Sequence, residues 1–154
     1  YNTFFTIFAW SDQALVDELK NKWEGSYNDL QGTLTGFDVK GLFYSDFWNQ
    51  WWSASVDMTG RTASQTSVNN PNTRWKNPAP VFQDAEVRKL HSKTMIIDAD
   101  TNSDPTVIVG STNWSNNGNN VNHENMLIIH DAAIANQFVQ EFNARYVQAG
   151  GTIQ

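Results

Sequence analysis

The sequence predicts an α/β fold in which a mixed β-sheet carries helices on both faces. Strand-like, helical and again strand-like segments follow one another at the start, as in a βαβ unit. Two short apolar runs separated by turn residues indicate an antiparallel hairpin later on, and an apolar repeat near helical period closes the chain. The length of 154 residues corresponds to about one domain, so we expect residues 1–154 to form a single lobe.

The N-terminal segment, residues 3–10, is β-branched or aromatic on both alternating sides, as expected for a central strand that is covered on both faces. Ser11 is suited to cap the helix that follows, and Gly25 to end it. Residues 37–44 indicate a second strand, parallel to the first because a helix joins them. The apolar residues of this helix recur near helical period at Ala14, Leu15, Leu19 and Trp23.

The middle of the chain, residues 58–80, is polar, contains three prolines and shows no periodicity, so we expect a long loop. The runs KTMII and TVIVG then predict the two strands of a hairpin. The segment ENMLIIH is apolar on both parities and predicts another central strand. Asp131 is suited to cap a final helix that ends near Gly150, and its apolar residues are Ile134, Phe138, Phe142 and Tyr146.

Composition excludes several classes of site. The chain has no cysteine, which rules out a thiol nucleophile, a disulfide framework and a thiolate metal centre. Its formal net charge of −6 argues against a surface that is basic throughout and binds nucleic acid by counterion release. Between Arg74 and Lys93, however, five bases stand against two acids. This local excess either steers an anionic substrate or is a set of scattered, solvated side chains.

The chain contains no run of eighteen apolar residues, so we expect no transmembrane segment. It opens on Tyr1 without an initiator methionine, which suggests a processed chain or a piece of a longer one. Its 18 asparagines and sparse lysines favour an exported bacterial protein.

The stretch after residue 90 concentrates the reactive side chains. His91 and Lys93 are two residues apart in a predicted strand and therefore share a face, whereas Asp98 lies at odd spacing from both. A lysine beside a histidine disfavours a metal ion and favours an anion. Gly110 permits a turn that presents Ser111 and Asn113 as hydrogen-bond donors.

A neutral imidazole held against a phosphorus atom can act as a nucleophile, with Lys93 and the Asn113 amide stabilising the charge that develops. Such an imidazole must be oriented. Glu124 is the one acidic residue in the segment VNHENML, and its carboxylate is suited to accept a hydrogen bond from one ring nitrogen of His91.

His91-x-Lys93 with Asp98 five residues later, Gly110-Ser111-x-Asn113, and then Glu124 together resemble the signature of the phospholipase D superfamily from about residue 90 to residue 131. The resemblance implies a phosphodiesterase lobe in which His91 forms a phosphohistidine. It implies phosphate-binding roles for Lys93 and Asn113, and supporting roles for Ser111 and for Glu124 against the imidazole. Asp98 would be structural. No metal and no cofactor are implied, and the substrate would be a phospholipid or a nucleic acid.

Members of this superfamily bring two such histidines together, one as nucleophile and one as general acid, whereas this chain has one motif. His123 and His130 are the other histidines, but the first points away from the Glu124 side of its strand and the second lies at that strand's far end. We therefore expect a second lobe, supplied by an identical chain or by the rest of a longer polypeptide.

Two further groups have open roles. The segment FWNQWW, residues 47–52, either stacks bases or touches lipid near the site, or belongs to the core or to an interface between lobes. Four basic residues are candidates to bind or steer a substrate phosphate, with Trp75 stacked between two of them: Arg74, Lys76, Arg88 and Lys89. The alternative functions are a non-catalytic lobe that binds phosphate or supports a partner, and a purely structural domain.

Overall fold

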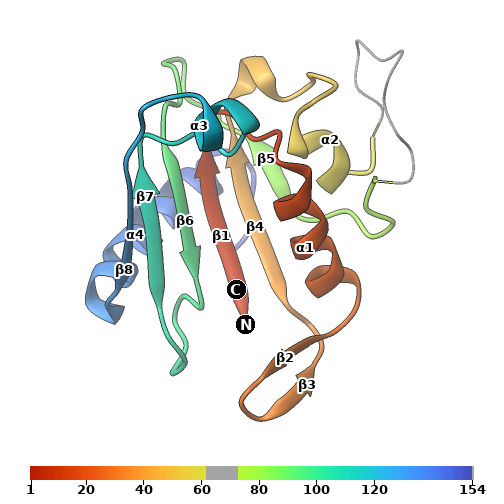
Figure 1. Cartoon of the computed structure of the whole chain (residues 1–154), viewed down its shortest axis with the longest axis vertical. Coiled ribbons are helices and arrows are strands. Elements are labelled where there is room, and N and C mark those ends of the chain that lie inside the picture. Colours follow the sequence, from red (N-terminus) through yellow and green to blue (C-terminus); the bar gives the residue numbers. More distant parts are fainter. Residues whose placement is uncertain (62–72, 154) are drawn as a thin grey trace.

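The computed structural model describes residues 1–61 and 73–153, which fold around a six-stranded sheet (Figure 1). The strand order is β5-β4-β1-β6-β7-β8. The pairs β1·β4 and β4·β5 are parallel and the pairs from β1·β6 to β7·β8 are antiparallel, so the sheet is mixed. The strands are β1 (Asn2–Ile7), β4 (Asp38–Phe43), β5 (Val81–Gln83), β6 (Lys93–Ile97), β7 (Thr106–Gly110) and β8 (Met126–His130).

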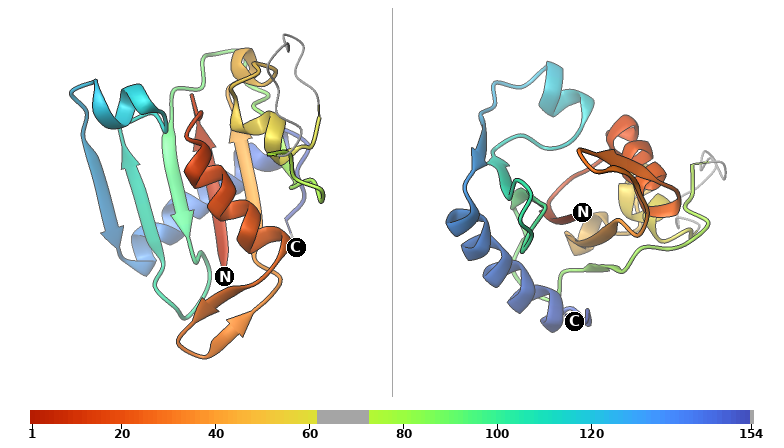
Figure 2. Two further views of the ribbon diagram at one scale, coloured as in Figure 1. Left: turned by 45° about the vertical axis from the view of Figure 1, so that its right-hand side comes forward. Right: turned by 90° about the horizontal axis from the view of Figure 1, so that it is seen from below.

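Helices cover both faces of the sheet, as Figure 2 shows. Helices α1 (Gln13–Glu24) and α2 (Ala54–Met58) pack on one face, and α4 (Ala132–Gln148) packs on the other. The short helices η1 (Ser45–Phe47) and α3 (Asn116–Asn120) lie at the end of the sheet where β1 and β4 finish (Figure 1). The predicted fold class, a mixed sheet between helices, is thus confirmed.

Alternation along β1 divides the interior into two cores. Phe5 and Ile7 face α1 and α2, and Phe4 faces α4, where its ring stacks on that of Phe142 at 5.4 Å. Gly41 on β4 is needed beside them, because a Cβ there would lie 2.0 Å from the Phe5 ring. The sheet is therefore buried on both faces at its centre, as the apolar pattern of the first strand predicts.

The N-terminal βαβ unit is confirmed, with β1 and β4 parallel and joined through α1. The predicted cap is wrong: the side chain of Asp12, not Ser11, accepts a hydrogen bond from the backbone of Leu15 at 3.2 Å. The strand also ends at Ile7 rather than residue 10. A small hairpin that was not predicted lies between α1 and β4 and consists of β2 (Tyr27–Asp29) and β3 (Gly32–Leu34).

In the second half, β6 and β7 form the predicted antiparallel hairpin, but the position predicted for ENMLIIH is wrong. It forms β8 at the edge of the sheet, not in its middle. Met126, Leu127 and Ile128 are 46%, 61% and 58% exposed. An apolar pattern on both parities indicates burial on both faces, and in this chain alone that burial is not achieved.

Of the loop predicted at residues 58–80, the structure describes residues 58–61 and 73–80. Met58 closes α2, which the sequence reasoning missed, and residues 73–80 form neither helix nor strand. Residues 62–72 of that loop lie outside the described part of the chain. Among the helices that the structure describes, none is long and apolar enough to cross a membrane.

Candidate active site

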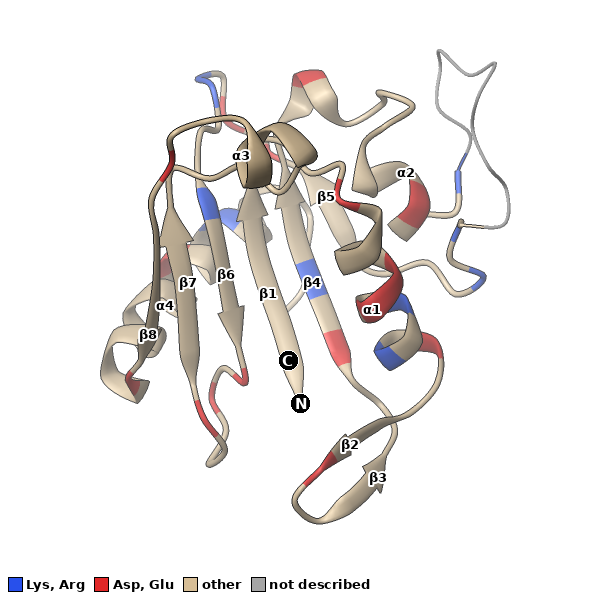
Figure 3. Cartoon of the chain, in the orientation of Figure 1, with Lys and Arg blue, Asp and Glu red and all other residues tan. Residues whose placement is uncertain are grey.

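The candidate residues lie together at one end of the strands, because β1 and β7 finish at the end where β6 and β8 begin. Strand β1 ends where β6 begins, so Ile7 pairs with Lys93, and the backbone N–H of Phe8 donates to the carbonyl of Ser92 at 2.8 Å. Strand β7 ends at the same edge, where β8 starts. Figure 3 shows the blue start of β6 and a red segment just before β8 at this edge. The sheet topology therefore brings both halves of the motif together.

Lys93 is buried against His91. Its Nζ lies 3.0 Å from each ring nitrogen of His91 and donates to the carbonyl oxygen of the same residue at 2.8 Å. Only 5% of Lys93 is exposed, whereas His91 is exposed to solvent. The ammonium thus holds the imidazole at the end of the sheet, where the residue is exposed to solvent.

Electrostatics favour the neutral form of this imidazole. Desolvation and the charges of Lys93 and Lys89 lower the pKa of His91 below its ordinary value of 6.5. Desolvation also lowers the pKa of Lys93, while the nearby carboxylate of Glu124 opposes that shift. A neutral imidazole can act as a nucleophile, and an ammonium beside it can stabilise negative charge.

Ser111 and Glu124 join the ends of β7 and β8. The Ser111 hydroxyl donates a short hydrogen bond to the Glu124 carboxylate and accepts one from the backbone N–H of Asn125 at 3.1 Å. Gly110 is needed beside them, since a Cβ there would lie 2.2 Å from the Asn125 carbonyl. Among the residues that the structure describes, no hydrogen bond joins Glu124 to His91, in contrast to the expected orienting contact.

Asn113 lies in the turn after β7 with an unused polar atom. Its Oδ1 is buried and has no hydrogen-bond partner within the described residues. The turn is fixed from both sides: the Trp114 carbonyl accepts from the backbone of Ser11 and Asp12, and a Cβ on Gly118 would lie 2.1 Å from the Asn113 carbonyl. This oxygen is an acceptor, so the group that satisfies it must be a hydrogen-bond donor.

The remaining predicted residues lie elsewhere. Asp98 follows β6 at the end away from His91, about 17 Å from Lys93 at the usual rise per residue. It has a positive φ of 55° and accepts from the backbone N–H of Asn2 at 3.4 Å. This contact fits the structural role expected for it. His130 also lies at that end, where its ring nitrogen is 2.8 Å from Asp104.

The substrate-binding role expected for Trp75 is wrong, because this side chain is 2% exposed and belongs to the core under α1 and α2. Arg74 and Lys76 flank it on the loop beside these helices, and the charge of Arg74 acts on Asp57 of α2. These bases are therefore not gathered at the start of β6. A base that is gathered there is Lys89, whose Nζ lies 4.7 Å from the centre of the Phe8 ring.

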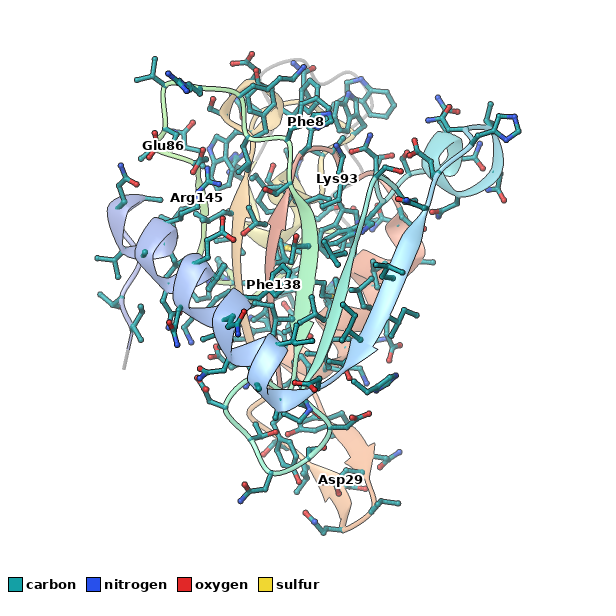
Figure 4. All side chains as sticks on the ribbon, turned by 90° about the vertical axis from the view of Figure 1, so that its left-hand side faces the viewer. Phe8, Asp29, Glu86, Lys93, Phe138 and Arg145 are labelled. Carbon is teal, nitrogen blue, oxygen red and sulfur yellow. The ribbon has the colours of Figure 1, made fainter. Side chains whose placement is uncertain are left out.

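Phe8 was missed by the sequence reasoning as a residue of the site. Its ring centre is 4.8 Å from that of His91 and 5.0 Å from Nζ of Lys93. Figure 4 shows Phe8 and Lys93 at the same end of the molecule. Only the pairing of β1 with β6 reveals this proximity, because the two segments are separated by more than half the chain.

Comparison with known proteins then decides the family. A family model described as "cardiolipin synthase, PLD-like domain" matches residues 35–146, which is most of the chain. The chain belongs to the phospholipase D superfamily. The matched range contains His91, Lys93, Ser111, Asn113 and Glu124, so the residues of the candidate site lie within the phospholipase D-like region.

Two solved structures share this phospholipase D-like fold. NucT from Helicobacter pylori is 16% identical, with a TM-score of 0.66 over 96% of this chain and 79% of that one. Nuc from Salmonella typhimurium, a phospholipase D family member, is 19% identical, with a TM-score of 0.61 over 99% of this chain and 82% of that one. At these identities the likeness establishes the fold. No curated protein matches the chain.

Proposed function

We propose that this lobe is a metal-independent phosphodiesterase of the phospholipase D type and acts through a phosphohistidine on His91. The observation that carries the proposal is the position of Lys93, whose ammonium lies 3.0 Å from both ring nitrogens of an imidazole with a lowered pKa. A ligand that binds both groups must be an anion with an electrophilic centre. A phosphodiester has these properties.

The reaction proceeds in two displacements. A phosphate oxygen draws the ammonium of Lys93 away from the ring, which frees one ring nitrogen of His91 to attack the phosphorus. The new P–N bond forms as the P–O bond to the leaving alcohol breaks, and a proton reaches the alcohol oxygen from a general acid. Water then attacks the phosphohistidine and loses its proton to the same group, which now acts as a base. The P–N bond breaks, which restores the free imidazole and releases a phosphomonoester.

Lys93 would stabilise the negative charge of the transition state, which other phosphodiesterases do with a metal ion. Its charge neutralises the oxygens of the crowded transition state, and it occupies the space against His91 where a metal ion would bind. The side-chain amino group of Asn113, in the turn after β7, would donate a second hydrogen bond to a phosphate oxygen. Among the described residues, no cluster of three or more histidine, aspartate and glutamate side chains could hold a metal ion.

The general acid is expected from a second lobe of the same kind. Of the two other histidines, His130 lies at the wrong end of the sheet, and His123 is on the exposed segment before β8. The second lobe would cover what we call the open face, formed by Met95, Ile108, Met126 and Ile128 on the α1 side of β6, β7 and β8. A groove of about 200 Å³ is lined by three of these residues and by Trp114, and Leu15 of α1 and Asn119 of α3 border it.

The first experiment combines light scattering with hydrolysis of bis(p-nitrophenyl) phosphate in EDTA. An active dimer is the expected result if an identical chain completes the site, and His91→Ala should abolish its activity. Full activity in His91→Ala would contradict the mechanism. An inactive monomer would assign the second lobe to a longer polypeptide, and phosphate binding without turnover by that polypeptide would favour the non-catalytic alternative.

A further inference from the structure

A row of aromatic rings leads away from the nucleophile. The ring centre of Phe8 lies 4.8 Å from that of His91 and 4.9 Å from that of Phe47, and Phe47 lies 5.1 Å from Trp52. Tyr44 joins the row from the side, at 5.2 Å from both Phe8 and Phe47. We call Phe8, Tyr44, Phe47 and Trp52 the aromatic row.

The topology of the sheet builds this row. Phe8 and Tyr44 directly follow the parallel strands β1 and β4, and the N–H of Tyr44 donates to the Ile7 carbonyl at 3.1 Å. Helix η1 then turns the chain so that Phe47 returns over Phe8, with its N–H on the Tyr44 carbonyl at 3.1 Å. The carboxyl ends of parallel strands are where open α/β sheets bind their ligands.

The aromatic row is not part of the interior. Its four members are each half-buried, and neither of the two cores found among the described residues includes them. The neighbouring Trp51 is 48% exposed. Rings that are held by one another but remain accessible at the mouth of a site are available to a ligand.

Charge limits what this ligand can be. The ammonium groups of Lys89 and Lys93 lie 4.7 and 5.0 Å from the centre of the Phe8 ring. They would repel a quaternary ammonium such as the choline of a phospholipid, although aromatic rings alone would attract it. They would not repel a neutral, flat ring that is attached to a phosphate.

We propose that the aromatic row binds a base of single-stranded nucleic acid next to the phosphate that His91 attacks. This inference rests on the proposed phosphodiesterase function and adds its substrate class. Bases stack on aromatic side chains only where their faces are free, which selects single strands over a duplex. Because the net charge is −6, stacking rather than charge attraction would supply the affinity, and the salt dependence of binding would be shallow.

The test compares oligothymidylate with an abasic oligonucleotide of the same length and charge, which keeps every phosphodiester and removes the bases. The measured quantity is the ratio of kcat/KM for the two strands. Stacking of one base predicts a ratio of about 5 to 100 in the unmodified chain. Phe47→Leu and Trp52→Leu should bring the ratio towards one, mainly through KM. Phe138→Leu, a half-buried phenylalanine on α4, is the matched control and should leave the ratio unchanged.

A ratio near one in the unmodified chain, or a ratio that Phe47→Leu and Trp52→Leu leave unchanged, would overturn the inference. Hydrolysis of the abasic strand would still support the phosphodiesterase. Faster turnover of phosphatidylcholine vesicles, lowered by the same two variants, would assign the aromatic row to lipid instead. If no diester is hydrolysed, the proposed function fails, and fluorescence anisotropy of the two labelled strands decides the inference: equal affinity would overturn it.

Discussion

Nζ of Lys93 lies 3.0 Å from both ring nitrogens of His91. It also donates a hydrogen bond to the backbone carbonyl oxygen of His91 at 2.8 Å. The position of the Lys93 ammonium is therefore fixed by contacts with His91. Because Lys93 is 5% exposed, its charge is desolvated and acts strongly on any anion that reaches the imidazole.

Replacing Lys93 with methionine should lower kcat for bis(p-nitrophenyl) phosphate by about 100- to 1000-fold, the usual cost of losing one group that stabilises the transition state. The midpoint of thermal unfolding should be unchanged or higher, because a buried ammonium is replaced by an apolar chain of similar length. Lys40→Met on β4 is the control and should retain kcat. A large loss of stability in Lys93→Met would point to a structural role instead.

The acid side of the pH profile should report the ionisation of His91. Attack requires the neutral ring, so kcat/KM should fall as pH drops through a pKa below 6.5. The positive charge of Lys89 contributes to that lowered pKa, so Lys89→Gln should raise it and move the acid limb to higher pH. Arg88→Gln, a neighbouring exposed base, should leave the limb in place. A shift to lower pH in Lys89→Gln would contradict this assignment.

Ser111 and Glu124 should behave as one unit, since a single short hydrogen bond joins the ends of β7 and β8 through them. Ser111→Ala and Glu124→Gln are each expected to lower kcat about tenfold. The double variant should be no worse than the poorer single variant, because the same contact is lost in all three. Losses that multiply would show instead that Glu124 acts directly on His91, as the sequence reasoning expected.

Two neighbouring residues of β8 can test whether the open face is the docking surface for a second lobe. Ile128 points to the open face, paired with Ile108, whereas Leu127 points to the α4 side, and the two are 58% and 61% exposed. Ile128→Lys should shift a dimer to the monomer in light scattering and remove phosphodiesterase activity. Leu127→Lys, with the same charge and similar exposure, should do neither. Equal effects of the two variants would show that the open face is not the docking surface.

The sequence predicts which helices and strands form better than it predicts where each strand lies in the sheet. Period and turn residues are local signals, and they identified the parallel pair β1·β4, the hairpin of β6 and β7, and the repeat of α4. The placement of β8 failed, because an apolar strand looks the same whether its own chain or a partner is to cover it. The cap at Asp12 failed because two adjacent residues had the required side-chain oxygen.

The candidate site divides in the same way. Residues within one motif, such as His91 and Lys93, lie side by side as expected because they are two residues apart, although β6 begins only at Lys93. Contacts between segments were not foreseen: Glu124 is bonded to Ser111, Trp75 lies in the core, and Phe8 lies against His91. Each of these depends on which strands are neighbours, and the spacing of residues along a chain does not contain that information.

The strand order also has a consequence for the time course of synthesis. Strand β1 is made before β6 but needs it as a neighbour on one side, and Ile7 lies 86 residues before its partner Lys93. Strands that are so far apart in the sequence pair slowly during folding. A nascent chain that stops after β5 would expose the apolar edge of β1 to other chains. His91 and Lys93 therefore come to lie beside Phe8 only after β6 has paired with β1.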